Sequence, residues 1–308
     1  MKILLTSTSF QDTPGNHHDL LNNNNWEVEY LRGPLKEAEI IDVIGKYDGL
    51  ICGDDDITEE VLLAGKNGKL KAISKYGIGL DKIDLVAANI FNIPIANTPG
   101  VNHVAVSEHA FMMLLAFYKN FIKEVKIVKS KKWTRLIGHE IWRKKIAVIG
   151  LGRIGKEMAK RCTSFGMDVW GYDLDIDEQF IIDNKISLIH SIDELDNTFD
   201  ILSLHLPLTK STKCIINEKI IHRLKQNVLI INTARADLVE KDALLSHLGQ
   251  KKEMGYYSDV LWEEPINENE QIVSLDNAVI TPHIASRTYQ SVERQGSAAV
   301  NNLRVLLG

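Results

Sequence analysis

Three side chains in the C-terminal half of the chain could act together on an acidic substrate. Arg235, Glu264 and His283 each follow a short apolar run. A guanidinium can hold a carboxylate with two hydrogen bonds. A protonated imidazole can donate to a carbonyl oxygen, and a nearby carboxylate orients the ring and favours its cation. These residue types therefore suit hydride transfer to a 2-keto acid.

Taken singly, each of these residues has an ordinary explanation. Most of the ten histidines are expected at the surface or at helix caps. Arg235 alone could cap a helix or form a surface ion pair, and Glu264 and its neighbour Glu263 could be solvated loop charges. All three follow strand-like runs, and ligands bind at the carboxyl ends of parallel strands. Their joint position therefore favours the hypothesis that they form a catalytic site.

A glycine-rich motif in the middle of the chain indicates a dinucleotide site. An apolar run from Lys145 leads into Gly150-Leu-Gly152-Arg-Ile-Gly155, and a second strand-like run ends at Asp173. In this pattern the first glycine permits a tight turn, the second lets the backbone approach a pyrophosphate, and the third lets a helix pack closely. The helix N-terminus would face the phosphates. Asp173 would bind the adenosine ribose and repel a 2′-phosphate, which favours NAD over NADP. The alternative is ordinary glycine packing.

Alternating strands and helices on both sides of this motif predict an α/β fold with two domains. The chain turns at Asn97-Thr-Pro-Gly100, and one long apolar helix is expected over Val104–Val128. The last segment, Ser286–Leu307, is expected to be a helix that packs back on the N-terminal domain. We expect a discontinuous domain of residues 1–98 and 286–308, a second domain of residues 99–285, and a cleft between them. The expected strands are Lys2–Thr6, Glu27–Leu31, Gly49–Cys52, Leu70–Lys75, Ile93–Asn97, Phe199–His205, Val228–Asn232, Gly255–Val260 and Ala278–Thr281.

Composition excludes several classes of protein. The 308 residues are 44% hydrophobic and 25% charged, with a net charge of −5, which gives no support for a nucleic acid or an anionic membrane as partner. The first residues contain too short an apolar run for a signal peptide or a membrane span. Cys52, Cys162 and Cys214 are far apart and have no metal-ligand spacing, so we expect no metal site and a cytoplasmic protein.

Several ordered motifs resemble the D-isomer-specific 2-hydroxyacid dehydrogenase family over nearly the whole chain. The resemblance implies a Rossmann-type NAD-binding domain and a smaller, flavodoxin-like α/β substrate domain. It also implies a homodimer, paired through the long helix after Gly100 and the segment through Trp133 and Trp142; the alternative is that these aromatic residues belong to an intramolecular core. The matching stretches are Gly77–Asp84, Asn97–Glu108, Gly150–Gly155, His205–Thr209, Asn232–Val239, Asp259–Pro265 and Thr281–His283.

The resemblance also implies a role for each site residue. Arg235 would bind the substrate carboxylate and keto oxygen, His283 would be the acid/base, and Glu264, directly before Pro265, would be its partner. Backbone amides around Ile78 and Gly79 would help to hold the carboxylate. The positions implied for the cofactor are Gly150, Gly152, Arg153, Ile154, Gly155, Asp173, Leu206, Pro207, Thr233, Ala234, Asp259 and Ala285.

Substrate identity depends on a few further residues. The segment around Lys75 looks most like the 3-phosphoglycerate dehydrogenases, and Lys75 could supply a cation to a phosphate. The acidic run Gly53-Asp-Asp-Asp56 would be unfavourable beside a phosphate, and we expect it to be a helix-capping and turn cluster before Thr58. Arg135 resembles a position from which a neighbouring subunit's arginine reaches the substrate.

Three functional hypotheses follow from these residues. The first is an NAD-dependent oxidoreductase for a D-2-hydroxyacid/2-keto acid pair, with 3-phosphoglycerate as the candidate substrate and serine biosynthesis as its setting. The second is a glyoxylate or hydroxypyruvate reductase, which needs no phosphate site. The third is a non-catalytic NAD-sensing scaffold protein, since a fold alone does not imply turnover.

Overall fold

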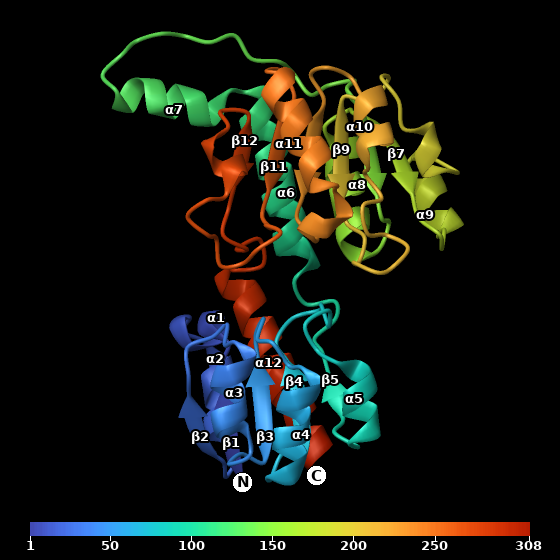
Figure 1. Ribbon diagram of the computed structural model, residues 1–308. Coiled ribbons are helices and arrows are strands. Elements are labelled where there is room, and N and C mark those ends of the chain that lie inside the picture. Colours follow the sequence, from blue (N-terminus) through green and yellow to red (C-terminus); the bar gives the residue numbers. More distant parts are fainter. The chain divides into compact units, whose positions relative to one another are not determined.

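The computed structural model describes all residues from 1 to 308, in two compact units (Figure 1). The first unit comprises Met1–Asn102 and Ser286–Gly308, and the second comprises His103–Ala285. Both units contain a parallel β-sheet with helices, so the predicted α/β class is confirmed. None of the helices is long and apolar enough to cross a membrane.

The first unit is built on a five-stranded sheet in the order β2-β1-β3-β4-β5. Every neighbouring pair of strands is parallel. The strands are β1 (Lys2–Leu5), β2 (Glu27–Tyr30), β3 (Gly49–Cys52), β4 (Ala72–Lys75) and β5 (Ile95–Ala96). The helices are α1 (Thr8–Asp12), α2 (Asn16–Asn22), α3 (Glu37–Ile44), α4 (Glu59–Asn67), α5 (Leu85–Ile90) and α12 (Tyr289–Leu307).

Helices cover both faces of this sheet, because successive side chains of a strand point to opposite sides. Leu4 of β1 packs with residues of α3, α4 and α5. Ile3 and Leu5 pack on the other face with residues of α1, α2 and α12. The C-terminal helix is fastened to the unit by hydrogen bonds, including one of 2.8 Å from Ser74 Oγ to the carbonyl of Ala299.

The second unit contains a seven-stranded parallel sheet in the order β12-β11-β10-β9-β6-β7-β8. The chain starts at the interior strand β6, extends to one side through β7 and β8, and then crosses to β9 on the other side. That reversal is the point at which parallel sheets bind dinucleotides. The strands are β6 (Lys145–Ile149), β7 (Asp168–Tyr172), β8 (Ser187–Leu188), β9 (Ile201–Leu204), β10 (Leu229–Asn232), β11 (Gly255–Ser258) and β12 (Ala278–Ile280).

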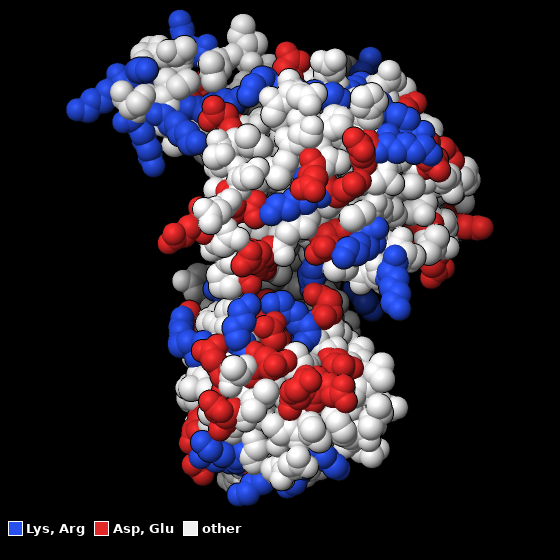
Figure 2. All heavy atoms as spheres, viewed as in Figure 1, with Lys and Arg blue, Asp and Glu red and all other residues white.

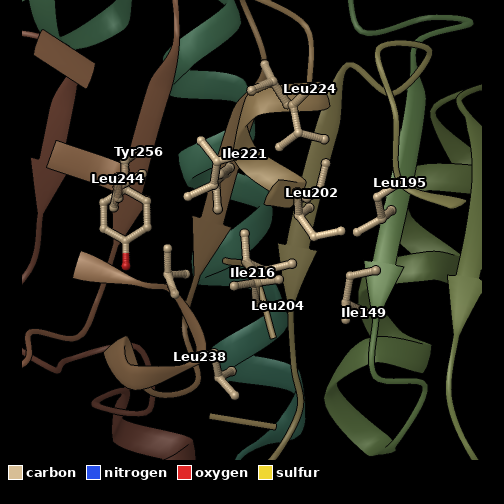
Figure 3. Packing of buried hydrophobic residues seen from close by; sticks show 14 of the residues in the cluster. Ile149, Leu195, Leu202, Leu204, Ile216, Ile221, Leu224, Leu238, Leu244 and Tyr256 are labelled. Carbon is tan, nitrogen blue, oxygen red and sulfur yellow. The ribbon is translucent and has the colours of Figure 1, made fainter. Parts of the chain in front are cut away.

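Two apolar clusters hold helices on the faces of this sheet. One contains residues of α6 and α8. The other contains residues of α10 and α11 and is drawn in Figure 3. The helices are α6 (His103–Tyr118), α7 (Phe121–Lys129), α8 (Arg153–Ser164), α9 (Glu178–Asp183), α10 (Glu218–Arg223) and α11 (Lys241–Gln250), with 3-10 turns η1 (Ile192–Glu194), η2 (Ala236–Leu238) and η3 (Gln271–Ser274).

The prediction of one continuous helix over Val104–Val128 was wrong. The segment forms two helices, α6 and α7, separated at Asn120, whose φ of 51° is left-handed and incompatible with a continuing helix. The break is stabilised because the amide of His139 donates to the carbonyl of Tyr118 at 2.7 Å. Helix α7 buries none of its residues, and within the second unit it extends away from the sheet (Figure 1).

Candidate functional site

The glycine-rich turn directly after β6 leaves no room for side chains at two positions. Gly150 has a φ of +100°, and a Cβ there would lie 2.8 Å from the backbone carbon of His205. A Cβ on Gly155 would lie 1.8 Å from the carbonyl oxygen of Gly150. Both glycines are therefore required by the turn itself, which brings the first residues of α8 close to the end of β6.

The N-terminus of α8 fits an anionic group. Gly152 is its N-cap, and no side chain caps the helix. A Cβ added at Gly152 would meet nothing within 4 Å, so the space in front of these amides is open. Arg153 and Ile154 are the first residues of the helix. Free N–H groups at the positive end of a helix dipole attract phosphate.

Asp173 lies just beyond the end of β7 and contacts the glycine-rich turn. Its Oδ2 accepts a hydrogen bond of 2.6 Å from the amide of Leu151, and its Oδ1 accepts one of 2.7 Å from the amide of Leu174. The carboxylate is thus held beside the turn, as expected for a group that would bind a ribose. An uncapped helix, open space and this carboxylate together fit a dinucleotide such as NAD.

Most of the other residues predicted for the cofactor follow neighbouring strands of the same sheet. Leu206 and Pro207 come after β9, and Thr233 and Ala234 come after β10. The hydroxyl of Thr233 is buried and lacks a hydrogen-bond partner in the protein. Since buried polar groups are normally satisfied, this hydroxyl is available to a bound molecule.

Asp259 has a structural task that sequence reasoning missed. Its side chain is buried, with 1% exposed. Oδ1 accepts hydrogen bonds from Thr281 Oγ1 at 2.5 Å and from the amide of Ile284 at 2.9 Å, and Oδ2 accepts one from the amide of Ala285 at 2.7 Å. The carboxylate therefore organises the segment 281–285, which carries His283.

His109 of α6 belongs to the same network and was also missed from the sequence. Its Nε2 lies 3.0 Å from Thr281 Oγ1 and 3.7 Å from Asp259 Oδ1. Burial lowers the pKa of His109, and the charge of Asp259 opposes this shift. No motif marks this residue, because its partners lie far along the chain.

His283 and Glu264 lie within hydrogen-bond distance of each other. His283 Nδ1 lies 2.8 Å from Glu264 Oε2, and Glu264 Oε1 accepts a hydrogen bond of 2.9 Å from the amide of Leu261. The two side chains are 34% and 33% exposed, so a substrate can reach them. The neighbouring Glu263 instead accepts a hydrogen bond from Asn267 Nδ2 at 2.6 Å.

Arg235 follows β10 and is held by local hydrogen bonds. Its Nη1 donates to the carbonyl of Ala234 at 2.7 Å. Asn232 Nδ2 donates to the carbonyl of Arg235 at 2.9 Å. Because β10, β11 and β12 are adjacent and parallel, the loops that carry Arg235, Glu264 and His283 meet at one edge of the sheet. The arrangement can bind an anion and exchange a proton beside it.

In the first unit, the structure gives Lys75 an intramolecular partner. The Lys75 side chain is 4% exposed, and its Nζ lies 2.7 Å from Asp54 Oδ1 and 2.5 Å from the carbonyl of Gly53. Its charge is thus compensated inside the unit. Ile78 and Gly79 lie in the loop after β4, where Asn97 Nδ2 donates to the carbonyl of Ile78 at 2.8 Å.

The acidic run from Gly53 to Asp56 is not a helix cap. Thr58 caps α4, with its Oγ1 accepting from the amide of Val61. Asp55 is buried and instead accepts hydrogen bonds from Thr6 Oγ1 at 2.5 Å and from the amide of Leu35 at 2.7 Å. The helix-capping part of that expectation was therefore wrong, because these carboxylates bind other strands and loops. Arg135 is exposed in the segment after α7.

Comparisons with known proteins agree with this geometry. Residues 111–285 match the family described as D-isomer specific 2-hydroxyacid dehydrogenase, NAD binding domain. The chain is 35% identical to a hydroxypyruvate reductase of Thermotoga maritima over 92% of this chain and 93% of that protein. It is 34% identical to a D-3-phosphoglycerate dehydrogenase of Methanocaldococcus jannaschii over 91% of this chain, but it spans only 53% of that longer protein.

A solved structure shows the same fold over almost the full length. The D-lactate dehydrogenase of Aquifex aeolicus, complexed with NAD and lactic acid, superposes with a TM-score of 0.86 at 30% identity. The similarity covers 98% of this chain and 94% of that one.

Proposed function

The chain belongs to the D-isomer specific 2-hydroxyacid dehydrogenase family, and we propose that it reduces a short, unphosphorylated 2-keto acid such as hydroxypyruvate or glyoxylate. It is an oxidoreductase that uses NAD. The observation that carries the proposal is the His283–Glu264 pair at 2.8 Å, on the same sheet edge as Arg235. This intact set also argues against a purely non-catalytic NAD-sensing role.

In the proposed reaction, Arg235 binds the substrate carboxylate and the keto oxygen. His283 donates its proton to that oxygen during reduction, and Glu264 orients the imidazole and stabilises its cation. When bound, the nicotinamide supplies the hydride. We also assign backbone amides around Ile78 and Gly79 to the substrate carboxylate.

The cofactor would be held mainly by the second unit, residues 103–285. We assign the pyrophosphate to Gly150, Gly152 and Gly155 with the first residues of α8, and the ribose to Asp173. The remaining proposed cofactor positions are Leu206, Pro207, Thr233, Ala234, Asp259 and Ala285. Asp259 would act indirectly, because its carboxylate holds the segment 281–285 in place.

The Lys75–Asp54 ion pair favours an unphosphorylated substrate. A phosphate site needs a cation that is not already neutralised, and the Lys75 ammonium is buried against a carboxylate. 3-Phosphoglycerate, and with it serine biosynthesis, remains a second candidate because of the 34% identity to phosphoglycerate dehydrogenases.

We further propose a homodimer that works in the cytoplasm. An apolar groove on the second unit is lined by Phe111, Met112 and Leu115 of α6 and by Phe121 of α7. In the segment after α7, Trp133 is 83% exposed and Ile137 is 90% exposed. Lysines and arginines gather around α7 (Figure 2). A second copy of the chain would cover these apolar groups. Arg135 of each copy would then reach the substrate site of the other.

A panel of keto acids tests the substrate assignment. NADH oxidation should be faster, in kcat/KM, with hydroxypyruvate or glyoxylate than with 3-phosphohydroxypyruvate. Lys75→Ala should leave the ratio of these values within about twofold, since the ammonium would not contact a phosphate. A preference for the phosphorylated acid that is lost in Lys75→Ala would overturn the assignment.

A further inference from the structure

Tyr256 is a buried polar residue of the second sheet that the proposed mechanism does not use. It lies on β11 with 0% of its surface exposed, inside the apolar cluster drawn in Figure 3. Burial raises the pKa of its phenol to about 12. A buried tyrosine hydroxyl normally has a hydrogen-bonding task, because its desolvation is otherwise unfavourable.

The Tyr256 hydroxyl contacts the residue that organises the Arg235 loop. Its oxygen accepts a hydrogen bond of 3.3 Å from Asn232 Nδ2. The same amide group donates to the carbonyl of Arg235 at 2.9 Å, and Asn232 Oδ1 accepts from the amide of Ala234 at 3.0 Å. Asn232 is itself fully buried. One N–H of the Asn232 side chain thus binds Tyr256, and the other binds the backbone of Arg235.

The Tyr256 ring makes a second link to the same loop. It stacks on Trp262, with ring centroids 6.2 Å apart and an interplanar angle of 19°. Trp262 Nε1 donates to the carbonyl of Val239 at 3.2 Å. Val239 follows the turn η2, which begins directly after Arg235. The segment from Asn232 to Val239 is therefore fastened at both ends to the Tyr256–Trp262 pair.

We propose that Tyr256 is a positioning residue that holds Arg235 in the orientation in which it binds the substrate carboxylate. This inference depends on the proposed role of Arg235. Loss of the phenol oxygen would leave one N–H of a buried amide without its acceptor and free Asn232 to turn. The guanidinium would then be less well oriented for a carboxylate, while the His283–Glu264 pair would keep its geometry.

Tyr256→Phe tests the proposal, with Tyr257→Phe as the matched control. Tyr257 is the next residue on β11 and also buried, but it points to the opposite face, where its ring contacts Phe117 at 5.5 Å. Tyr256→Phe should raise the KM for hydroxypyruvate by about tenfold, the usual effect of leaving one buried donor unsatisfied. The KM for NADH and the pH profile of kcat should match those of Tyr257→Phe.

A double-mutant cycle separates positioning from a general structural effect. If Tyr256 acts through Arg235, its substitution should add less than about twofold to the KM of an Arg235→Lys variant. Full additivity of the two KM effects, or equal KM values in Tyr256→Phe and Tyr257→Phe, would overturn the proposal.

Hydrogen exchange distinguishes a failure of the positioning role of Tyr256 from a failure of the proposed function. The amides of residues 234–239 should exchange faster in Tyr256→Phe than in Tyr257→Phe, whatever the wild-type protein reduces. Faster exchange with no keto-acid turnover in the wild type would refute the proposed function alone. Unchanged exchange would refute the positioning role alone.

Discussion

His283 reaches Glu264 because its backbone adopts a left-handed conformation that the buried Asp259 supports. The φ of His283 is 53°, a region that non-glycine residues adopt only when the surrounding structure enforces it. The amide of His283 donates to the carbonyl of Asp259 at 3.0 Å, and the Asp259 carboxylate holds the next two amides. The His283–Glu264 contact is thus supported by a residue whose side chain does not touch either of them.

The carboxylate of Glu264 should govern the pH dependence of reduction. In Glu264→Gln the shape of the side chain is kept, but the negative charge that favours the imidazolium is lost. At high pH kcat/KM falls because His283 loses the proton that it would donate. In Glu264→Gln this fall should therefore occur about one pH unit lower. Profiles of kcat/KM with hydroxypyruvate measure this shift. Glu263→Gln is the control, and an equal shift in both variants would contradict the assignment.

Asp173 should determine the preference for NADH. Asp173→Ala removes the group that would bind the ribose and repel a 2′-phosphate, and it also releases the Leu151 amide. The KM for NADH should rise by about tenfold, the effect of losing a charge-assisted hydrogen bond, and activity with NADPH should increase relative to NADH. Asp175→Ala, at an exposed position two residues further on, should behave as wild type. An unchanged coenzyme ratio in Asp173→Ala would show that another group discriminates.

His205 should make the protein sensitive to acid. Burial lowers its pKa to about 3, whereas the unfolded chain binds this proton near pH 6.5. The unfolded state therefore binds more protons between these values, so stability is lost as the pH falls below 6.5. The loss from this one group is about 2 kcal/mol between pH 6.5 and pH 5. Denaturant titrations at both pH values should show a smaller loss in His205→Gln, and an identical loss would refute the assignment.

The proposed homodimer predicts a simple change in mass. The wild-type chain should have the mass of a dimer in light scattering. Met112→Lys places a charge in the apolar groove of α6 and should yield a monomer that retains its fold by circular dichroism. A charge reversal away from this face, Asp193→Lys, should remain dimeric. A monomeric wild type at micromolar concentration would refute this part of the proposal.

Local patterns predicted the parts of the protein that local physics determines. The apolar runs marked the strands within one or two residues, except for the short β8 (Ser187–Leu188), which was not expected. The spacing of Gly150, Gly152 and Gly155 marked a turn whose steric limits are local. Only the resemblance favoured Glu264 over Glu263 as the partner of His283. Geometry, not spacing, now distinguishes them.

The missed features depend on contacts between distant segments. The break at Asn120 depends on hydrogen bonds from Asn120 to the carbonyl of Ile137 and from the amide of His139 to Tyr118. No proline or glycine in the sequence marks its position. The Lys75–Asp54 pair joins the last residue of β4 to the segment after β3, and the Asp259 network joins the end of β11 to the segment after β12. Such pairings cannot be read from charge or spacing along the chain, since either partner could equally be solvated.

The most direct test of the central claim is the rate of NADH oxidation by His283→Ala with saturating hydroxypyruvate. If the imidazole delivers the proton to the keto oxygen, kcat should fall by about 10²- to 10⁴-fold, while NADH affinity, measured by fluorescence titration, stays unchanged. A kcat close to that of the wild-type protein, in an assay limited by chemistry, would contradict the account.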